Sequence, residues 1–143
     1  MTYQYLDDIA IADIAFRADG GSLEEVFREA TDATTNAMVE NIDDIVESTT
    51  RQVSLSSESI DMLLFSLLQE LIFFKDAEQL LLRVKTISVA PHGDTFRLSC
   101  TLSGEKIDPD RHNLIVDVKA VTLYQFRVEQ SPHGYRATVV LDV

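Results

Sequence analysis

The sequence predicts an α+β fold, a two-layer sandwich in which an antiparallel or mixed β-sheet carries two helices on one face. Two stretches have apolar residues at helical spacing, and the second half of the chain alternates like strands that follow one another through tight turns. Strands joined in this way favour antiparallel pairing. Two helices with broad apolar faces would cover one side of the sheet. The 143 residues fit the usual size of one domain, so we expect a single domain over residues 1–143.

The first strand and the first helix are expected on either side of residues 19–21. Apolar side chains alternate along residues 10–18, as in a strand with one buried face. Asp19-Gly20-Gly21 interrupts this alternation, and Ser22 and Glu25 have the Ser-x-x-Glu spacing of a capping box. A helix is therefore expected to begin at Ser22 and to end near Asn41.

A second helix is expected after a serine-rich segment. Residues 52–55 could form a short strand, and the serines between positions 54 and 59 offer N-caps. The apolar residues that follow recur at helical spacing: Ile60, Leu63, Leu64, Leu67, Leu68, Leu71 and Phe74. So wide an apolar face predicts that this helix packs against a sheet.

The rest of the chain is predicted to be four strands separated by turns and one polar loop. The Pro-His-Gly sequences at residues 91–93 and 132–134 mark two of the turns, and residues 105–114 form the loop. The expected strands are 80–89, 95–104, 116–128 and 135–141.

The net charge of −12 limits the function classes. An acidic surface repels phosphate backbones, which argues against direct tight binding to DNA or RNA. Basic protein partners and divalent cations remain compatible with it, and so does a simple role in solubility.

The N-terminal residues, the longest apolar run and the single cysteine predict where the protein is found and how Cys100 behaves. The first residues lack a basic region, and the apolar run at residues 62–74 is too short and too polar to span a bilayer. We therefore expect no membrane association and a cytoplasmic protein. Cys100 is the only cysteine and lies in an alternating apolar run, so it is expected to be a small buried hydrophobic residue.

The histidines do not predict an active site. His92 and His133 lie in the two Pro-His-Gly turns and His112 lies in the polar loop, and no partner stands at metal-ligand spacing. All three are therefore expected to be exposed. The sequence also lacks a glycine-rich phosphate loop, a nucleophile elbow and a Cys-x-x-Cys motif.

Acidic residues near both ends of the chain are the candidate site. Asp13 lies in an apolar strand pattern, and Asp142 follows the apolar run 139–141 and precedes Val143. If the first and last strands are neighbours, Asp13, Asp142 and the terminal carboxylate of Val143 form a cluster of hard oxygen ligands. Such ligands suit Ca²⁺ or Mg²⁺ rather than Zn²⁺. The alternative is that both aspartates are ordinary exposed strand residues.

Lys119 is a further candidate. It lies on the polar side of the predicted 116–128 strand, together with Asp117 and Gln125. It could make a surface ion pair of little energetic value, or it could place a cation near the acidic cluster or near a partner's phosphate-bearing ligand.

Several segments together resemble the archease family. The stretch Ala12–Ala18 followed by Gly20–Phe27 is similar to the opening of archeases, and residues 63–71 are similar to their second helix. The later matches are Gly104-Glu105-Lys106, Val118-Lys119-Ala120-Val121-Thr122 and the ending Val140-Leu141-Asp142-Val143. These matches run in order along essentially the whole chain.

The resemblance implies an accessory role in tRNA processing. It implies an α+β sandwich that activates an RtcB-type RNA ligase, promotes GTP-dependent loading of GMP onto that ligase and allows repeated turnover, without being an enzyme itself. It implies that Asp13, Asp142 and Val143 hold a divalent cation, either Ca²⁺ or Mg²⁺/Mn²⁺. Lys119 corresponds to the family's characteristic lysine and is a candidate partner contact.

The sequence departs from the archease pattern at one place, and two other functions are also considered. Archeases usually have His-Thr where this chain has Ala10-Ile11, so a histidine that could support the metal or a partner is missing. The first alternative function is a chaperone-like modulator of a tRNA methyltransferase, in which the acidic residues serve only solubility. The second, a metal-dependent hydrolase, lacks a credible general base in the sequence.

Overall fold

The computed structural model describes residues 2–6 and 13–143. Ala10 and Ile11, where the sequence departs from the archease pattern, lie outside the described residues. The described residues form strands, two α-helices and one short 3-10 helix. In chain order these are β1 (Thr2–Leu6), β2 (Ile14–Gly20), α1 (Leu23–Met38), η1 (Ile42–Asp44), β3 (Thr49–Ser57), α2 (Ile60–Glu78), β4 (Leu80–His92), β5 (Thr95–Lys106), β6 (Ala120–Ser131) and β7 (Gly134–Asp142).

The described strands form two antiparallel sheets rather than one. One sheet has the order β1-β2-β7-β6 and the other has the order β3-β5-β4. The predicted α+β class and the antiparallel pairing are confirmed, and the difference lies in the number of sheets. It arises because β3 adds to the β4–β5 hairpin, whereas β7 returns to pair with β2 near the start of the chain.

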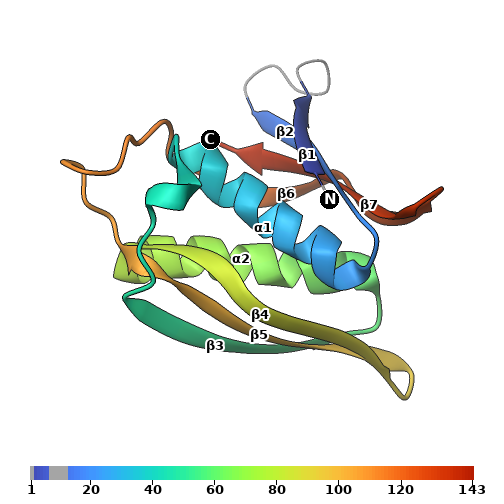
Figure 1. Ribbon diagram of the computed structural model, residues 1–143. Coiled ribbons are helices and arrows are strands. Elements are labelled where there is room, and N and C mark those ends of the chain that lie inside the picture. Colours follow the sequence, from blue (N-terminus) through green and yellow to red (C-terminus); the bar gives the residue numbers. More distant parts are fainter. Residues whose placement is uncertain (1, 7–12) are drawn as a thin grey trace.

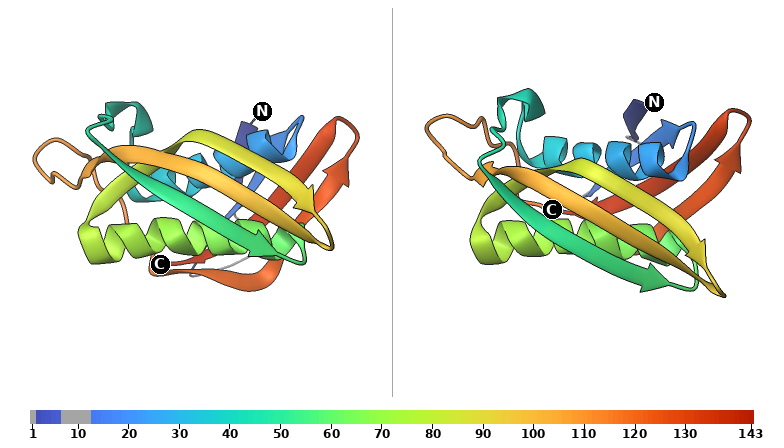
Figure 2. Two further views of the ribbon diagram at one scale, coloured as in Figure 1. Left: turned by 90° about the horizontal axis from the view of Figure 1, so that it is seen from below. Right: turned by 60° about the horizontal axis from the view of Figure 1, so that its bottom comes forward.

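Both helices lie between the two sheets and contact strands of each. α1 packs on β2 and β7 of the four-stranded sheet and on β4 of the three-stranded sheet, and α2 packs on β6 and on β3, β4 and β5. Figure 1 shows the three-stranded sheet below α2, with α1 and the four-stranded sheet above. Figure 2 shows the three-stranded sheet crossing in front of the helices. The helices are therefore covered on two sides, not on one.

The composition of α1 suits this crowded position. Ser22 caps the helix by accepting a hydrogen bond from the Glu25 main-chain N–H, as the capping-box spacing predicts. Small residues such as Ala30 and Ala33 are fully buried and let the strands approach closely. Thr35 donates its hydroxyl hydrogen bond to the Leu82 carbonyl on β4, 2.9 Å away, so its polar atom is satisfied in the core.

α2 contributes the larger apolar side chains of the core. Ser59 caps it by accepting a hydrogen bond from the Met62 main-chain N–H. The predicted stripe is buried between the sheets; its fully or nearly fully buried members are Leu63, Leu64, Leu67, Leu68 and Leu71. In the part of the chain that the structure describes, no helix is long and apolar enough to cross a membrane.

The start of β6 differs from the expected strand. The alternation over residues 116–128 predicts one continuous strand, but β6 begins at Ala120. Its pairing with β7 also shifts register between Thr122 and Arg127, where Gln125 has a positive φ of 52°. Residues 107–119 instead cross the end of α1 as an irregular segment, here named the 107–119 loop.

Candidate functional site

The pairing of β2 with β7 brings Asp13 and Asp142 to the same end of the four-stranded sheet. Ile14 pairs with Leu141 in the last registered pair, so Asp13 and Asp142 are the residues next to that pair at the end of the sheet. Both aspartates are partly buried. The sequence-based condition that the first candidate residue and the last strand be neighbours is therefore met.

The main chain of Lys119 joins this end of the sheet from the other side of β7. Ala120 pairs with Asp142, and the Lys119 main-chain N–H donates a hydrogen bond to the Asp142 carbonyl, 2.8 Å away. Val143 follows Asp142 directly. The main chains of all four candidate residues, Asp13, Lys119, Asp142 and Val143, thus lie at one end of this sheet.

The side chain of Lys119 lies toward α2. It is exposed and lines a depression of about 210 Å³ together with Phe73 and Asp76. Asp142 is opposite Ala120 in the register, so its side chain and that of the neighbouring Lys119 leave opposite faces of the strand pair. Lys119 is therefore better placed to contact a partner over α2 than to neutralise the two aspartates.

The donor types at the aspartate pair fit a hard cation. Ca²⁺ takes 6–8 oxygen ligands and Mg²⁺ six, and carboxylates supply them in most protein sites. Within residues 2–6 and 13–143, no group of three or more His, Cys, Asp or Glu side chains is arranged to hold a metal ion. Asp13 and Asp142 could therefore supply only part of a coordination shell, and other oxygen ligands would have to complete it.

Lys75 fixes the end of the 107–119 loop next to this site. Its side chain is 5% exposed, and its ammonium donates to Asp117 Oδ1 at 2.5 Å and to the Val118 carbonyl at 2.7 Å. It also pairs with Asp76 Oδ1 at 2.7 Å. Burial alone lowers the pKa of Lys75, but its hydrogen bonds to Asp117 and Asp76 raise that pKa above its ordinary value. The ammonium thus stays charged and holds the main chain one residue before Lys119.

Lys75 was not predicted as a functional residue, although the sequence contains a signal for it. Lys75 stands four residues after Leu71, where it continues the apolar stripe of α2. A lysine at a core-facing position needs a partner because a buried charge without one is costly. The position of Lys75 in the sequence therefore predicts that acidic side chains or carbonyl groups bind its ammonium in the folded protein.

The expectation that His112 is exposed is wrong. Its side chain is 0% exposed, and its Nδ1 accepts a hydrogen bond from the Asp108 main-chain N–H at 2.9 Å. An accepting Nδ1 carries no proton, so the proton of the neutral ring is on Nε2 and is donated to Glu105 Oε2, 3.1 Å away. The sequence did not predict this burial, because residues 105–114 are mostly polar and were expected to form an exposed loop.

Glu105 connects His112 with Arg111 and with the segment after η1. The Arg111 guanidinium hydrogen-bonds Glu105 Oε1, and the Val46 main-chain N–H donates to Glu105 Oε2 at 2.7 Å. Arg111, followed by the Val46 and His112 hydrogen bonds, lowers the pKa of Glu105 to about 2. A charged Glu105 therefore holds the base of the 107–119 loop.

The other predicted side-chain environments agree with the structure. His92 and His133 are exposed in their turns. Cys100 is 1% exposed, and burial raises the pKa of its thiol to about 11, so it is a packed hydrophobic residue and not a reactive thiolate.

Comparison with known proteins identifies the family of this arrangement. The model of the Archease protein family (MTH1598/TM1083) matches residues 3–143. The protein archease of Pyrococcus abyssi is 32% identical over 133 residues, which cover 92% of this chain and 93% of that protein. The protein archease of Archaeoglobus fulgidus is 32% identical over 145 residues, which cover 100% of both chains.

Solved structures have the same fold. The solution structure of protein 1598 of Methanobacterium thermoautotrophicum superposes with a TM-score of 0.82 at 28% identity, over 99% of this chain and 98% of that one. An archease from Thermotoga maritima, described as a possible chaperone, superposes with a TM-score of 0.62 at 19% identity, over 94% and 93% of the two chains. The second likeness concerns the fold alone. The match over residues 3–143 and the full-length relatives together show that the chain belongs to the archease family.

Proposed function

We propose that this protein is an accessory factor of tRNA splicing that activates an RtcB-type RNA ligase and does not seal RNA itself. In this proposal it promotes the GTP-dependent guanylylation of the ligase and allows multiple turnover. The observation that carries the proposal is the β2–β7 pairing, whose last registered pair, Ile14–Leu141, adjoins both Asp13 and Asp142 in a chain of the archease family.

A divalent cation, either Ca²⁺ or Mg²⁺/Mn²⁺, would be held at this end of the sheet. Asp13 and Asp142 would supply side-chain oxygens and Val143 a main-chain oxygen, which are ligands that hard cations prefer. Water or groups of the ligase would complete the shell. When bound, the ion would supply positive charge close to phosphate oxygens, the usual role of such ions in phosphoryl transfer.

The charge of the molecule supports a protein partner over a nucleic acid. Its net charge of −12 favours docking on the positively charged surroundings of a nucleotide site, because complementary charge speeds the encounter. Lys119 would then contact the partner from the face over α2, where its side chain is exposed.

The test is ligase turnover on tRNA halves with the cognate RtcB-type ligase, GTP and Mg²⁺ or Mn²⁺. We expect several turnovers per ligase with the wild-type protein, and about one turnover or fewer with Asp13→Ala or without the protein. Asp94→Ala, in the exposed β4–β5 turn, is a matched control and should act like the wild type. Equal turnover in all four reactions would remove the ligase proposal.

A chaperone-like role toward a tRNA methyltransferase is the second candidate. It is favoured by the description of the Thermotoga maritima structure as a possible chaperone. In that role the acidic residues serve solubility, so Asp13→Ala should protect the methyltransferase from thermal aggregation as well as the wild type does. The ligase proposal therefore predicts that Asp13→Ala loses activation, and the chaperone proposal predicts that Asp13→Ala keeps its protective effect.

A further inference from the structure

The 107–119 loop exposes three consecutive aliphatic side chains. Leu114, Ile115 and Val116 are 48%, 56% and 37% exposed. Single exposed apolar residues are common on protein surfaces, but a contiguous group next to a candidate site indicates an interaction surface. This group leads directly to Lys119, whose main chain is hydrogen-bonded to Asp142.

The main chain beneath these side chains is fixed. The Ile115 N–H donates to the Met38 carbonyl and the Glu40 N–H donates to the Asn113 carbonyl, both at 2.8 Å. Lys75 holds the Val118 carbonyl at 2.7 Å at the far end of the same stretch. A surface that is ordered before binding loses less conformational entropy when a partner docks.

Two shallow depressions accompany the aliphatic group. One, of about 230 Å³, is lined by Met38, Ile107 and residues 114–117, among others. The other, of about 210 Å³, is lined by Lys119 and Phe73. Phe73 is 57% exposed. Sites for drug-sized molecules usually measure about 300–1,000 Å³, so these depressions suit single side chains of a protein partner better. Exposed aromatic residues such as Phe73 are frequent anchors of such contacts.

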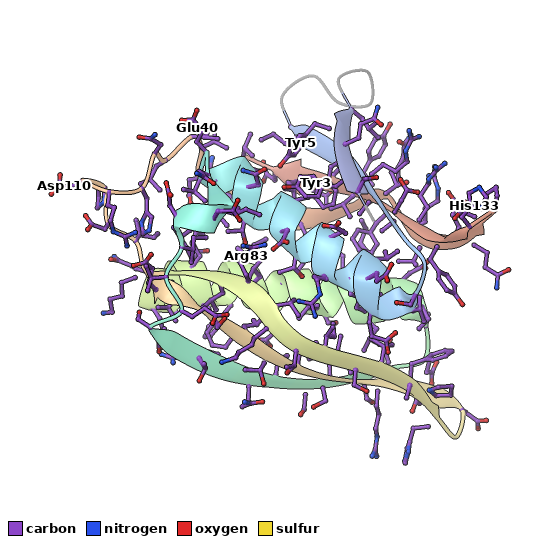
Figure 3. All side chains as sticks on the ribbon, viewed as in Figure 1. Tyr3, Tyr5, Glu40, Arg83, Asp110 and His133 are labelled. Atoms are coloured by element: carbon purple, nitrogen blue, oxygen red, sulfur yellow. The ribbon has the colours of Figure 1, made fainter. Side chains whose placement is uncertain are left out.

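The rim of this surface is acidic. Glu40, Asp44, Asp108, Asp110 and Asp117 are all exposed on the loop or on the segments hydrogen-bonded to it. Figure 3 shows Glu40 and Asp110 at the same end of the molecule. Two of the nearby cations are engaged within the chain, since Arg111 binds Glu105 and the Asp44 carbonyl and Lys75 binds Asp117, whereas Lys119 is exposed at the second depression. The rim therefore favours positive charge on whatever docks.

We infer that Phe73, Leu114, Ile115 and Val116, here named the docking face, bind a segment of the ligase in which apolar side chains are flanked by lysines or arginines. The apolar side chains enter the two depressions, and the flanking cations meet the acidic rim. A segment bound there lies beside the end of the sheet that contains Asp142, because the Lys119 N–H is hydrogen-bonded to the Asp142 carbonyl, and the Asp142 side chain leaves the other face. This inference rests on the proposed function and adds the surface and the chemistry of the partner segment.

The test is an activation titration that separates docking from activation. Ligase turnover is measured against the concentration of wild type, Ile115→Ser, Phe73→Ser and the control Leu123→Ser, which removes a 64% exposed residue of β6 that lines neither depression. We expect Ile115→Ser and Phe73→Ser to raise the half-saturating concentration about tenfold or more, with an unchanged plateau. Leu123→Ser should match the wild type. Asp13→Ala should show the reverse pattern, a lower plateau at an unchanged half-saturating concentration.

Direct binding is measured in parallel, by fluorescence anisotropy of labelled ligase without GTP. If the wild type activates and the two docking-face variants match it in both assays, the docking face is wrong while the proposed function stands. If the wild type does not activate the ligase, the proposed function fails, and the binding assay alone tests the docking face. Weaker binding of the two variants than of Leu123→Ser then supports the docking face, and equal or absent binding overturns it.

Discussion

The buried imidazole of His112 makes two hydrogen bonds, one to the Asp108 N–H within the 107–119 loop and one to Glu105 on β5. We predict that His112→Ala lowers the free energy of unfolding by about 1–3 kcal/mol, because the Asp108 N–H loses its acceptor and a cavity remains. Urea unfolding followed by circular dichroism measures this. His92→Ala, in the exposed β4–β5 turn, is the control and should change stability by less than about 0.5 kcal/mol. Equal, small effects of both substitutions would show that the His112 contacts contribute nothing.

Glu105 should make stability depend on acid pH. Its pKa is lowered to about 2 in the folded protein, against 4.5 for an ordinary glutamate. The charged form is therefore favoured by folding, and its contribution is complete above about pH 4.5 and is lost as the pH falls toward about 2. We expect the difference in unfolding free energy between wild type and Glu105→Gln to be constant from pH 7 to 5 and to shrink toward pH 3. A difference that stays constant down to pH 3 would contradict this.

At the scale of elements, Lys75 joins the end of α2 to the main chain that leads into β6. We predict that Lys75→Met speeds hydrogen exchange at the Lys119 amide, because the neighbouring Val118 carbonyl loses its donor and the Lys119–Asp142 hydrogen bond opens more often. The free energy of unfolding should fall by about 1–3 kcal/mol because the buried Val118 carbonyl loses its donor, whereas Asp76 and Asp117, 57% and 68% exposed, remain solvated.

The matched control for Lys75 is Lys85→Met, at an exposed position on β4. Exchange at Lys119 should be unaffected by that substitution. If Lys75→Met also leaves the Lys119 amide unchanged, then Lys75 does not position the loop. Exchange measured by NMR resolves this single amide from its neighbours.

Local signals predicted the helices well and the strand ends poorly. Ser22 and Ser59 cap their helices as expected, because capping depends on residues three positions apart. The alternation at residues 116–119 predicted the start of a strand. The Val118 carbonyl instead accepts a hydrogen bond from Lys75, which lies 43 positions away in the sequence, and no local pattern predicts this contact. β1 was not predicted, because its pairing with β2 depends on tertiary contacts that no short pattern reports.

At the scale of the whole molecule, the two helices should couple the two sheets into one cooperative unit. All four tyrosines, Tyr3, Tyr5, Tyr124 and Tyr135, lie in the four-stranded sheet, and the chain has no tryptophan. Tyrosine fluorescence therefore reports on that sheet, whereas circular dichroism at 222 nm reports mainly on the helices. We predict coincident urea transitions by both probes, as for two-state unfolding. Separate midpoints would show that the sheets unfold independently.

The candidate site was predictable in part, because it depends on how the ends of the chain pair. Asp13 and Asp142 attract attention as acidic residues in apolar strand patterns, and their convergence needed only the β2–β7 pairing that the structure has. The division of the strands into two sheets was not predictable in this way. A helix between two sheets and a helix on one sheet both need broad apolar faces, and spacing alone does not tell them apart.

We propose that the Asp13–Asp142 end of the sheet acts on guanylylation of an RtcB-type ligase. The most direct measurement is the rate of covalent GMP loading onto the ligase from labelled GTP, with wild type, Asp142→Asn and the exposed-turn control Asp94→Asn. We predict that wild type and Asp94→Asn accelerate loading equally and that Asp142→Asn loses about tenfold or more of this acceleration, the scale typical of changes at metal sites. Acceleration by Asp142→Asn equal to that of the wild type would contradict the account.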